Sequence, residues 1–131
     1  MPRYFTVAEA EALLPDLQPL LERLRELHRQ LGAIEQERLA AHWQARHNGP
    51  VRPDGPGASS AAEHEQVVDE MNRLLHRVHA LGAEVKDLEL GLVDFPHVRE
   101  GRMVYLCWKL GEPRIAWWHE LEAGYAGRQP L

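Results

Sequence analysis

Apolar residues in the first two-thirds of the chain recur at alternating steps of four and three. The first series consists of Leu13, Leu17, Leu20, Leu24, Leu27, Leu31 and Ile34. An average step of about 3.5 residues is the heptad spacing, which keeps one apolar seam along a helix. A second series with this spacing consists of Val67, Met71, Leu74, Val78 and Leu81. We therefore expect two long helices that pair as an antiparallel, coiled-coil-like hairpin.

Local signals set the expected limits of these helices. Thr6–Glu9 and Ser60–Glu63 both fit a capping box, in which the first side chain and the fourth bond each other's backbone amides. Pro15 and Pro19 predict a kink after a short first helix, and Gly82 predicts the end of the last one. The expected order is a kinked helical region over 7–47, a flexible loop rich in Gly and Pro over 48–60, and a second helix over 61–81.

After Gly82 the pattern changes to alternation with many aromatic residues, which is typical of strands. A first strand over 91–95 should end at Pro96, and two further strands should cover 103–110 and 115–121. Turns are expected at 97–102 and 111–114. The region 84–131 is therefore predicted as a three-stranded antiparallel β-meander, which makes the fold class α+β.

The second predicted hairpin also suggests a register. Pairing its strands symmetrically about the turn places Trp108 opposite Trp117 and Leu106 opposite His119. Directly paired residues share one face of a sheet. We therefore expect His119 beside Leu106 on the face that packs against the helices.

Composition narrows the class of protein. The chain has 131 residues, with 44% hydrophobic and 27% charged, which predicts a single domain over 1–131. A net charge of −5 argues against a nucleic-acid partner, which needs a basic face. No apolar run reaches the ~20 residues of a membrane span. A single cysteine and the lack of a signal-peptide pattern predict a cytoplasmic protein.

The two helices differ in expected length, which suggests an oligomer. The second helix is too short to cover the first, so the leucine-rich stretch over 13–27 needs another partner. We predict a homodimer formed through the helices.

The residues most suited to chemistry lie in the C-terminal third. His119 could bind a transition metal ion (Zn, Fe or Mn) together with carboxylates from Asp87, Asp94 or Glu122. The alternative is a core histidine hydrogen-bonded to a buried carboxylate. No HExxH motif is present, and His119 and Glu120 should point to opposite faces of their strand.

Two further features have alternative interpretations. The aromatic residues Tyr105, Trp108, Trp117 and Trp118 could line a ligand pocket, or they could simply pack the core. Cys107 lies in the middle of a strand, where a buried and inert thiol is expected.

Four stretches of the chain carry a resemblance to a known family: RYFTVAEAEALLP, KDLELGLVDFP, GRMVYLCWKLGE and WWHELEAGYAGRQPL. Together they resemble the uncharacterised bacterial family called domain of unknown function 2203. The resemblance implies a compact bacterial cytoplasmic protein, and it brings no established activity.

Two functions are compatible with these patterns. In the first, the protein binds a metal ion or small ligand near the C-terminal sheet. In the second, it is a non-catalytic dimeric module that interacts through its helices. The sequence does not distinguish an enzyme from a non-catalytic binding protein.

Overall fold

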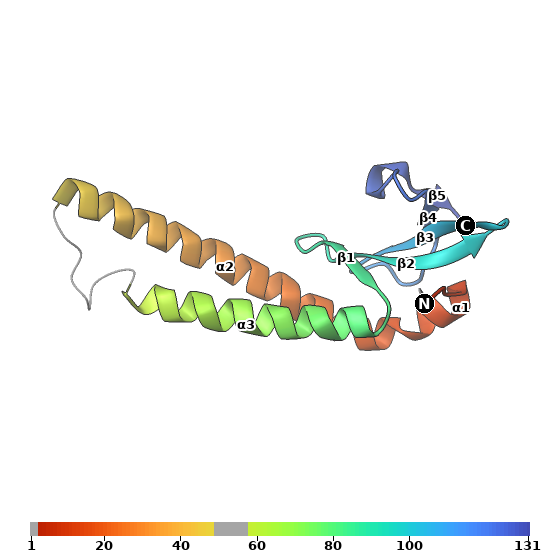
Figure 1. Ribbon diagram of the computed structural model, residues 1–131, viewed down its shortest axis with the longest axis horizontal. Coiled ribbons are helices and arrows are strands. Elements are labelled where there is room, and N and C mark those ends of the chain that lie inside the picture. Colours follow the sequence, from red (N-terminus) through yellow and green to blue (C-terminus); the bar gives the residue numbers. More distant parts are fainter. Residues whose placement is uncertain (1–2, 49–57) are drawn as a thin grey trace. The chain divides into compact units, whose positions relative to one another are not determined.

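The computed structural model describes residues 3–48 and 58–131, and the fold is α+β as expected (Figure 1). The helices precede the strands along the chain. The helices are α1 (Val7–Ala12), α2 (Leu14–Asn48) and α3 (Ala58–Ala80). The strands are β1 (Glu84–Asp87), β2 (Leu92–Arg99), β3 (Arg102–Lys109), β4 (Trp117–His119) and β5 (Gln129–Pro130), and a short 3-10 helix covers Tyr125–Gly127.

The described residues form two compact units. One comprises residues 3–25 with 74–131 and contains α1, the start of α2, the end of α3 and the whole sheet. The other comprises the described part of 26–73, which is helical. The single domain expected from chain length stays a prediction. Among the described helices, none has both the length and the apolar composition that a bilayer crossing requires.

The N-terminal capping box is confirmed. The Glu9 amide donates to the Thr6 hydroxyl at 3.1 Å, and the Thr6 amide donates to the Glu9 carboxylate at 3.0 Å. The predicted break follows, because α1 ends at Ala12 and α2 begins at Leu14. Pro19 then lies inside α2, which continues past it.

The limits of α3 were predicted less well at its start than at its end. The helix begins at Ala58, and Ser60 already lies within its first turn. The prediction of a capping box that starts at Ser60 was therefore wrong. Of the loop expected over 48–60, residues 49–57 lie outside the described residues. At the other end, α3 stops at Ala80, and the Gly82 amide donates to the His79 carbonyl at 2.9 Å. The helix end at Gly82 is therefore confirmed.

The sheet has five strands rather than the expected three, ordered β1-β2-β3-β4-β5, and all neighbouring strands are antiparallel (Figure 1). The prediction that Pro96 ends its strand was also wrong, since β2 continues to Arg99. Pro96 lies beyond the residues of β2 that pair with β1. The lack of an amide hydrogen at Pro96 therefore removes no hydrogen bond between these two strands. The turn between β2 and β3 consequently shrinks to Glu100 and Gly101.

The predicted register of β3 and β4 was wrong by one residue. His119 pairs with Tyr105, and Trp117 pairs with Cys107. The connection between the strands is longer than a tight turn, and one local and one long-range hydrogen bond hold it. The Lys109 amide donates to the Glu112 carboxylate at 2.7 Å, and the Ile115 amide donates to the Glu11 carboxylate at 3.1 Å. A shift of one residue moves His119 to the opposite face from Leu106.

One face of the sheet, here called the apolar face, forms the core of its unit. Its fully buried members are Val93, Phe95, Val104, Leu106 and Trp108. Phe5 packs edge-on against Phe95 with ring centroids 5.5 Å apart, and its amide donates to the Pro96 carbonyl at 2.8 Å. The N-terminal segment thus covers the sheet before the first helix begins.

The leucine-rich stretch of α2 does not need a second chain to bury it. Leu17, Leu21, Leu24 and Leu27 are each at most 1% exposed within the single chain. The reason given above for a dimer therefore no longer holds. The dimer itself stays a prediction that needs another surface.

Candidate metal centre

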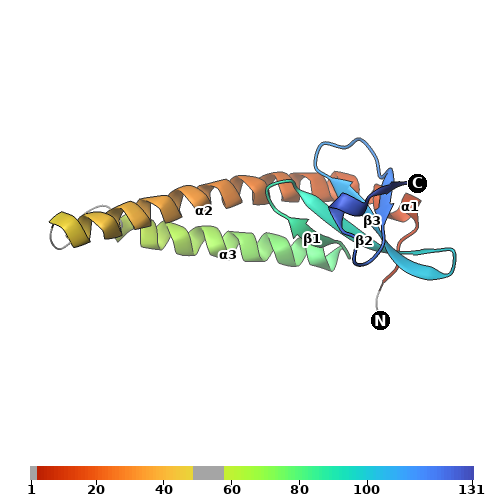
Figure 2. The same cartoon turned by 90° about the horizontal axis from the view of Figure 1, so that it is seen from above.

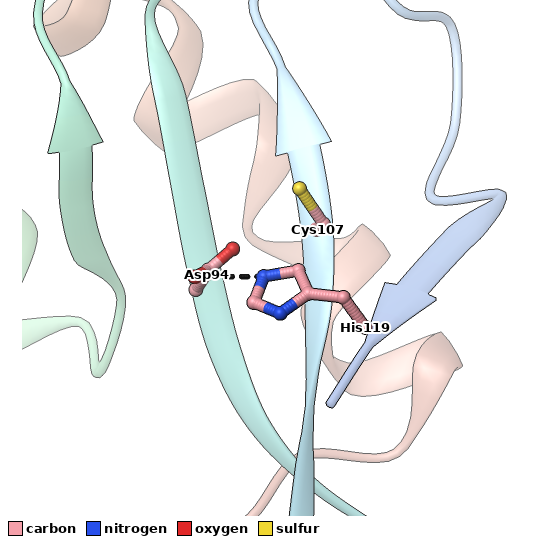
Figure 3. Close-up of side chains that lie close together, drawn as sticks. All are labelled: Asp94, Cys107 and His119. Carbon is pink, nitrogen blue, oxygen red and sulfur yellow. Dashed lines mark ion pairs between the residues drawn. The ribbon is translucent and has the colours of Figure 1, made fainter. Parts of the chain in front are cut away.

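Three neighbouring strands each place one polar side chain on the face opposite the apolar face, here called the polar face (Figure 3). Asp94 comes from β2, Cys107 from β3 and His119 from β4. Asp94 and Cys107 are directly paired, and His119 lies on the next strand beside them. One donor atom from each of the three lies within 4.8 Å of the other two. All three residues are buried, with exposures of 2%, 0% and 2%.

His119 is fixed by contacts to both of its ring nitrogens. Nε2 lies 3.0 Å from Asp94 Oδ2, and Nδ1 lies 2.7 Å from the Glu120 carbonyl oxygen. A carbonyl can only accept, so Nδ1 carries a proton and donates it. Burial raises the pKa of Asp94, while the hydrogen bond from His119 acts in the opposite direction. The Asp94–His119 pair therefore holds one proton between its two facing atoms.

The second carboxylate oxygen of Asp94 is the irregular feature of this cluster. Oδ1 is buried and has no hydrogen-bond partner among the described residues. Leaving a buried acceptor unpaired costs about 1–3 kcal/mol, and more when the group is charged. The Cys107 thiol interacts with this carboxylate only as a weak hydrogen-bond donor, which does not replace a full hydrogen bond. The unpaired oxygen therefore marks the cluster as a place where a cation would be stabilised.

Cys107 is not an activated nucleophile. Burial raises the pKa of its thiol to about 11, although Arg128 acts to lower it. Neither nitrogen of His119 is directed at the sulfur, because both meet other acceptors. Asp94 also interacts with the thiol and raises its pKa, so the thiol is protonated near neutral pH. The expectation of a buried thiol is confirmed, but its place in a polar cluster was missed.

A second group of charged and aromatic side chains borders the cluster on its β1 side. The Tyr105 ring lies 5.6 Å from the His119 ring, and Lys86 Nζ lies 5.1 Å from the Tyr105 ring centre. Burial and the neighbouring Glu84 raise the pKa of Tyr105, which keeps its hydroxyl protonated. Glu84 Oε2 is buried without a hydrogen-bond partner, 3.6 Å from Lys86 Nζ. This side is more exposed than the cluster itself.

The structure unites only part of the predicted site. Asp94 meets His119, whereas Asp87 lies outside the three-residue cluster and accepts from the Leu90 amide at 2.9 Å. Glu122 is exposed in a turn and also lies outside the cluster. The four aromatic candidates divide between the two faces. Tyr105 and Trp117 lie on the polar face, and Trp108 and Trp118 on the apolar face.

These features define a class: a small α+β protein with a buried carboxylate, thiol and imidazole on adjacent strands. Over residues 3–131 the chain matches a family described as an uncharacterized conserved protein, DUF2203. The chain therefore belongs to the DUF2203 family. No curated protein and no solved structure matches it.

Proposed function

We propose that this protein binds one divalent transition metal ion of the zinc class through Asp94, Cys107 and His119. The observation that carries the proposal is the buried, unpaired Asp94 Oδ1 within a cluster of three possible ligands. A bound cation would satisfy this oxygen, take the place of the proton between Asp94 and His119, and bind the sulfur as thiolate.

The donor set favours zinc over the other ions considered. Thiolate and imidazole ligands suit zinc, while all-oxygen sites suit manganese. Ligands of one tetrahedral zinc lie roughly 3.3–3.7 Å apart, given bond lengths of about 2.0–2.3 Å. The 3.0 Å contact of Asp94 and His119 needs to open only slightly. The hydrogen bond from Nδ1 to the Glu120 carbonyl would fix the orientation of the ring, as the bond from the other ring nitrogen does in metal-binding histidines.

Metal binding at this cluster has two chemical consequences. The ion must displace the Cys107 proton and the proton shared by Asp94 and His119, so about two protons are released per ion. Three protein ligands leave a fourth tetrahedral position for water or a small ligand. A thiolate ligand also suits a reducing cytoplasm, which is the compartment expected for this protein.

Titration of metal-free protein with Co²⁺ tests the proposal. We expect one equivalent to bind, with a near-ultraviolet band from sulfur-to-cobalt charge transfer and the visible bands of tetrahedral cobalt. Added Zn²⁺ should remove both, and a weakly buffered solution should record the released protons. Cobalt binding without the sulfur band, or no binding at all, would contradict the proposed centre.

We also propose a second function, in which α2 and α3 of the unit 26–73 form an antiparallel coiled-coil-like hairpin that associates with a second copy. The side-by-side course of the helices within this unit supports the hairpin (Figures 1 and 2). So do the buried seam residues Ile34, Ala41, Val67 and Met71. The second copy would cover Leu39 and Trp43, which are 68% and 58% exposed. Their spacing of four residues places both on one side of α2.

Light scattering after size exclusion tests this association. The wild-type protein should have about twice the 15.0 kDa chain mass, and Leu39→Glu should restore the monomer by placing a charge in the contact. Leu90→Glu is the matched control, because Leu90 is 39% exposed in the other unit. A wild-type mass of 15.0 kDa at micromolar concentration would contradict the proposed dimer.

A further inference from the structure

Arg128 connects the C-terminal segment to the sulfur of the candidate metal centre. Its Nε–H donates to Cys107 Sγ at 3.3 Å, and Nη2 donates to the Cys107 carbonyl at 3.2 Å. One guanidinium therefore contacts both the side chain and the backbone of the same residue. The Arg128 side chain is only 11% exposed, so these contacts form in a largely dry environment.

The guanidinium is held in place from several directions. Glu112 accepts from it through both oxygens, at 2.9 Å from Nη1 and 2.6 Å from Nη2. The Glu112 carboxylate is fixed in turn by the Lys109 amide at 2.7 Å. The rings of Tyr125 and Trp117 lie 4.9 Å and 5.5 Å from the Arg128 guanidinium carbon. A two-pronged carboxylate contact with aromatic neighbours sets the orientation of an arginine more strictly than a single ion pair does.

The segment that carries Arg128 is also attached to the sheet through Tyr125, whose hydroxyl accepts from Lys109 Nζ at 3.3 Å, and through the Leu131 amide, which donates to the Ala116 carbonyl at 3.0 Å. It consists of Gly124, the 3-10 helix Tyr125–Gly127, and β5, which has only two residues. β5 pairs with β4 through Trp118 and Trp117, and β4 carries the candidate ligand His119. The other contacts of this segment are exposed or lie at its end, whereas Arg128 supplies its part-buried hydrogen bonds to Cys107 and Glu112.

We propose that Arg128 is a positioning residue of the metal centre, and that metal binding and docking of the segment 124–131 stabilise each other. The inference rests on the proposed function. A metal-bound sulfur carries more negative charge than a thiol, so its hydrogen bond from the guanidinium becomes charge-assisted and stronger. Thermodynamic linkage then requires the docked segment to strengthen metal binding by the same factor.

The same contact controls access to the donor atoms. Asp94, Cys107 and His119 are at most 2% exposed, so an ion can exchange only when a covering element moves. The segment 124–131 is the element tied directly to the sulfur. Its detachment should therefore accompany metal release.

The experiment compares cobalt binding and release in the wild type and in Arg128 variants. Arg128→Met keeps a long side chain without N–H donors, and Arg128→Lys keeps the charge without the planar fork. Both should weaken Co²⁺ binding, Arg128→Met by roughly 10–100-fold, the range typical of substitutions that remove a hydrogen bond to a metal ligand. Release to a chelator should accelerate, and the sulfur-to-cobalt band should move to lower energy because the sulfur loses its hydrogen bond. Arg114→Met, at an exposed position, is the control and should match the wild type.

Hydrogen exchange supplies the reciprocal measurement. Zn²⁺ should slow amide exchange over 124–131 in the wild type, and this protection should be lost in Arg128→Met. Glu112→Gln is the second variant, for use if Arg128→Met folds poorly. It keeps the Arg128 donor to Cys107 but weakens the carboxylate contact that holds Arg128, so we expect an intermediate loss of Co²⁺ affinity. If the wild type binds cobalt through sulfur while the Arg128 and Glu112 variants keep its affinity, release rate and band energy, the inference is overturned and the metal centre stands. If the wild type shows no sulfur-to-cobalt band, the proposed metal centre itself is contradicted, and the inference about Arg128 is overturned with it.

Discussion

Cys107→Ser should remove the sulfur-to-cobalt band and weaken Co²⁺ binding by more than the roughly 10–100-fold expected for losing a hydrogen bond to a ligand. Serine is close to cysteine in shape, but its hydroxyl is a poor ligand because it does not ionise near neutral pH. The substitution leaves the Asp94–His119 pair intact, so the fold should persist. Cobalt titration and metal analysis of the purified variant measure the loss.

Two controls separate this centre from general attraction of cations to acidic groups. Asp87→Asn and Glu122→Gln each remove a carboxylate near the sheet that lies outside the cluster, and both should bind cobalt like the wild type. His119→Ala is a less clean test, because it leaves Asp94 as a buried group without its partner. Breaking such a pair costs about 3–5 kcal/mol. Equal cobalt affinity in Cys107→Ser and wild type would exclude Cys107 as a ligand.

Gly82→Ala should be among the most destabilising single-methyl additions in this chain. Gly82 has φ 99°, where a residue with a Cβ is strained by about 1–3 kcal/mol. An added Cβ would also lie 2.3 Å from Phe5 Cζ. Phe5 is 2% exposed and packed against Phe95, so moving it costs a further amount of about 1–3 kcal/mol. Urea denaturation of both proteins gives the difference in free energy of unfolding.

Gly111→Ala is the matched control for this loss. Gly111 has φ 103°, and nothing lies within 4 Å of an added Cβ. It should therefore show the backbone strain alone. In the double variant Phe5→Ala, Gly82→Ala the two losses should be less than additive, because removing the ring also removes the clash. If Gly82→Ala lowers the free energy of unfolding by no more than Gly111→Ala does, Phe5 does not pack closely against Gly82.

The helical half of this protein could largely be predicted from its sequence. The capping box at Thr6 and the helix end before Gly82 are local features, and the structure reproduces both. Heptad spacing correctly indicated long helices with buried leucines. These signals depend on residues a few positions apart, so no knowledge of distant contacts was needed.

The sheet depended on contacts that the sequence does not display. β1 and β5 are short strands of four and two residues without a clear alternating pattern, and both are defined by the strands beside them. The path of β2 through Pro96 likewise depends on where β1 ends. A pattern of hydrophobic residues could therefore indicate a sheet here without giving its strand count.

By itself the sequence determined the α+β class, the break after the first helix and the end of the last one, and it named His119 with Asp87, Asp94 or Glu122 as candidate ligands. Only the tertiary structure added Cys107, because the face on which a strand residue lies depends on register. That register follows from Glu112 holding the Lys109 amide and Glu11 holding the Ile115 amide. The contact with Glu11 spans 104 positions in the chain, so only the folded structure could bring Asp94, Cys107 and His119 to one face.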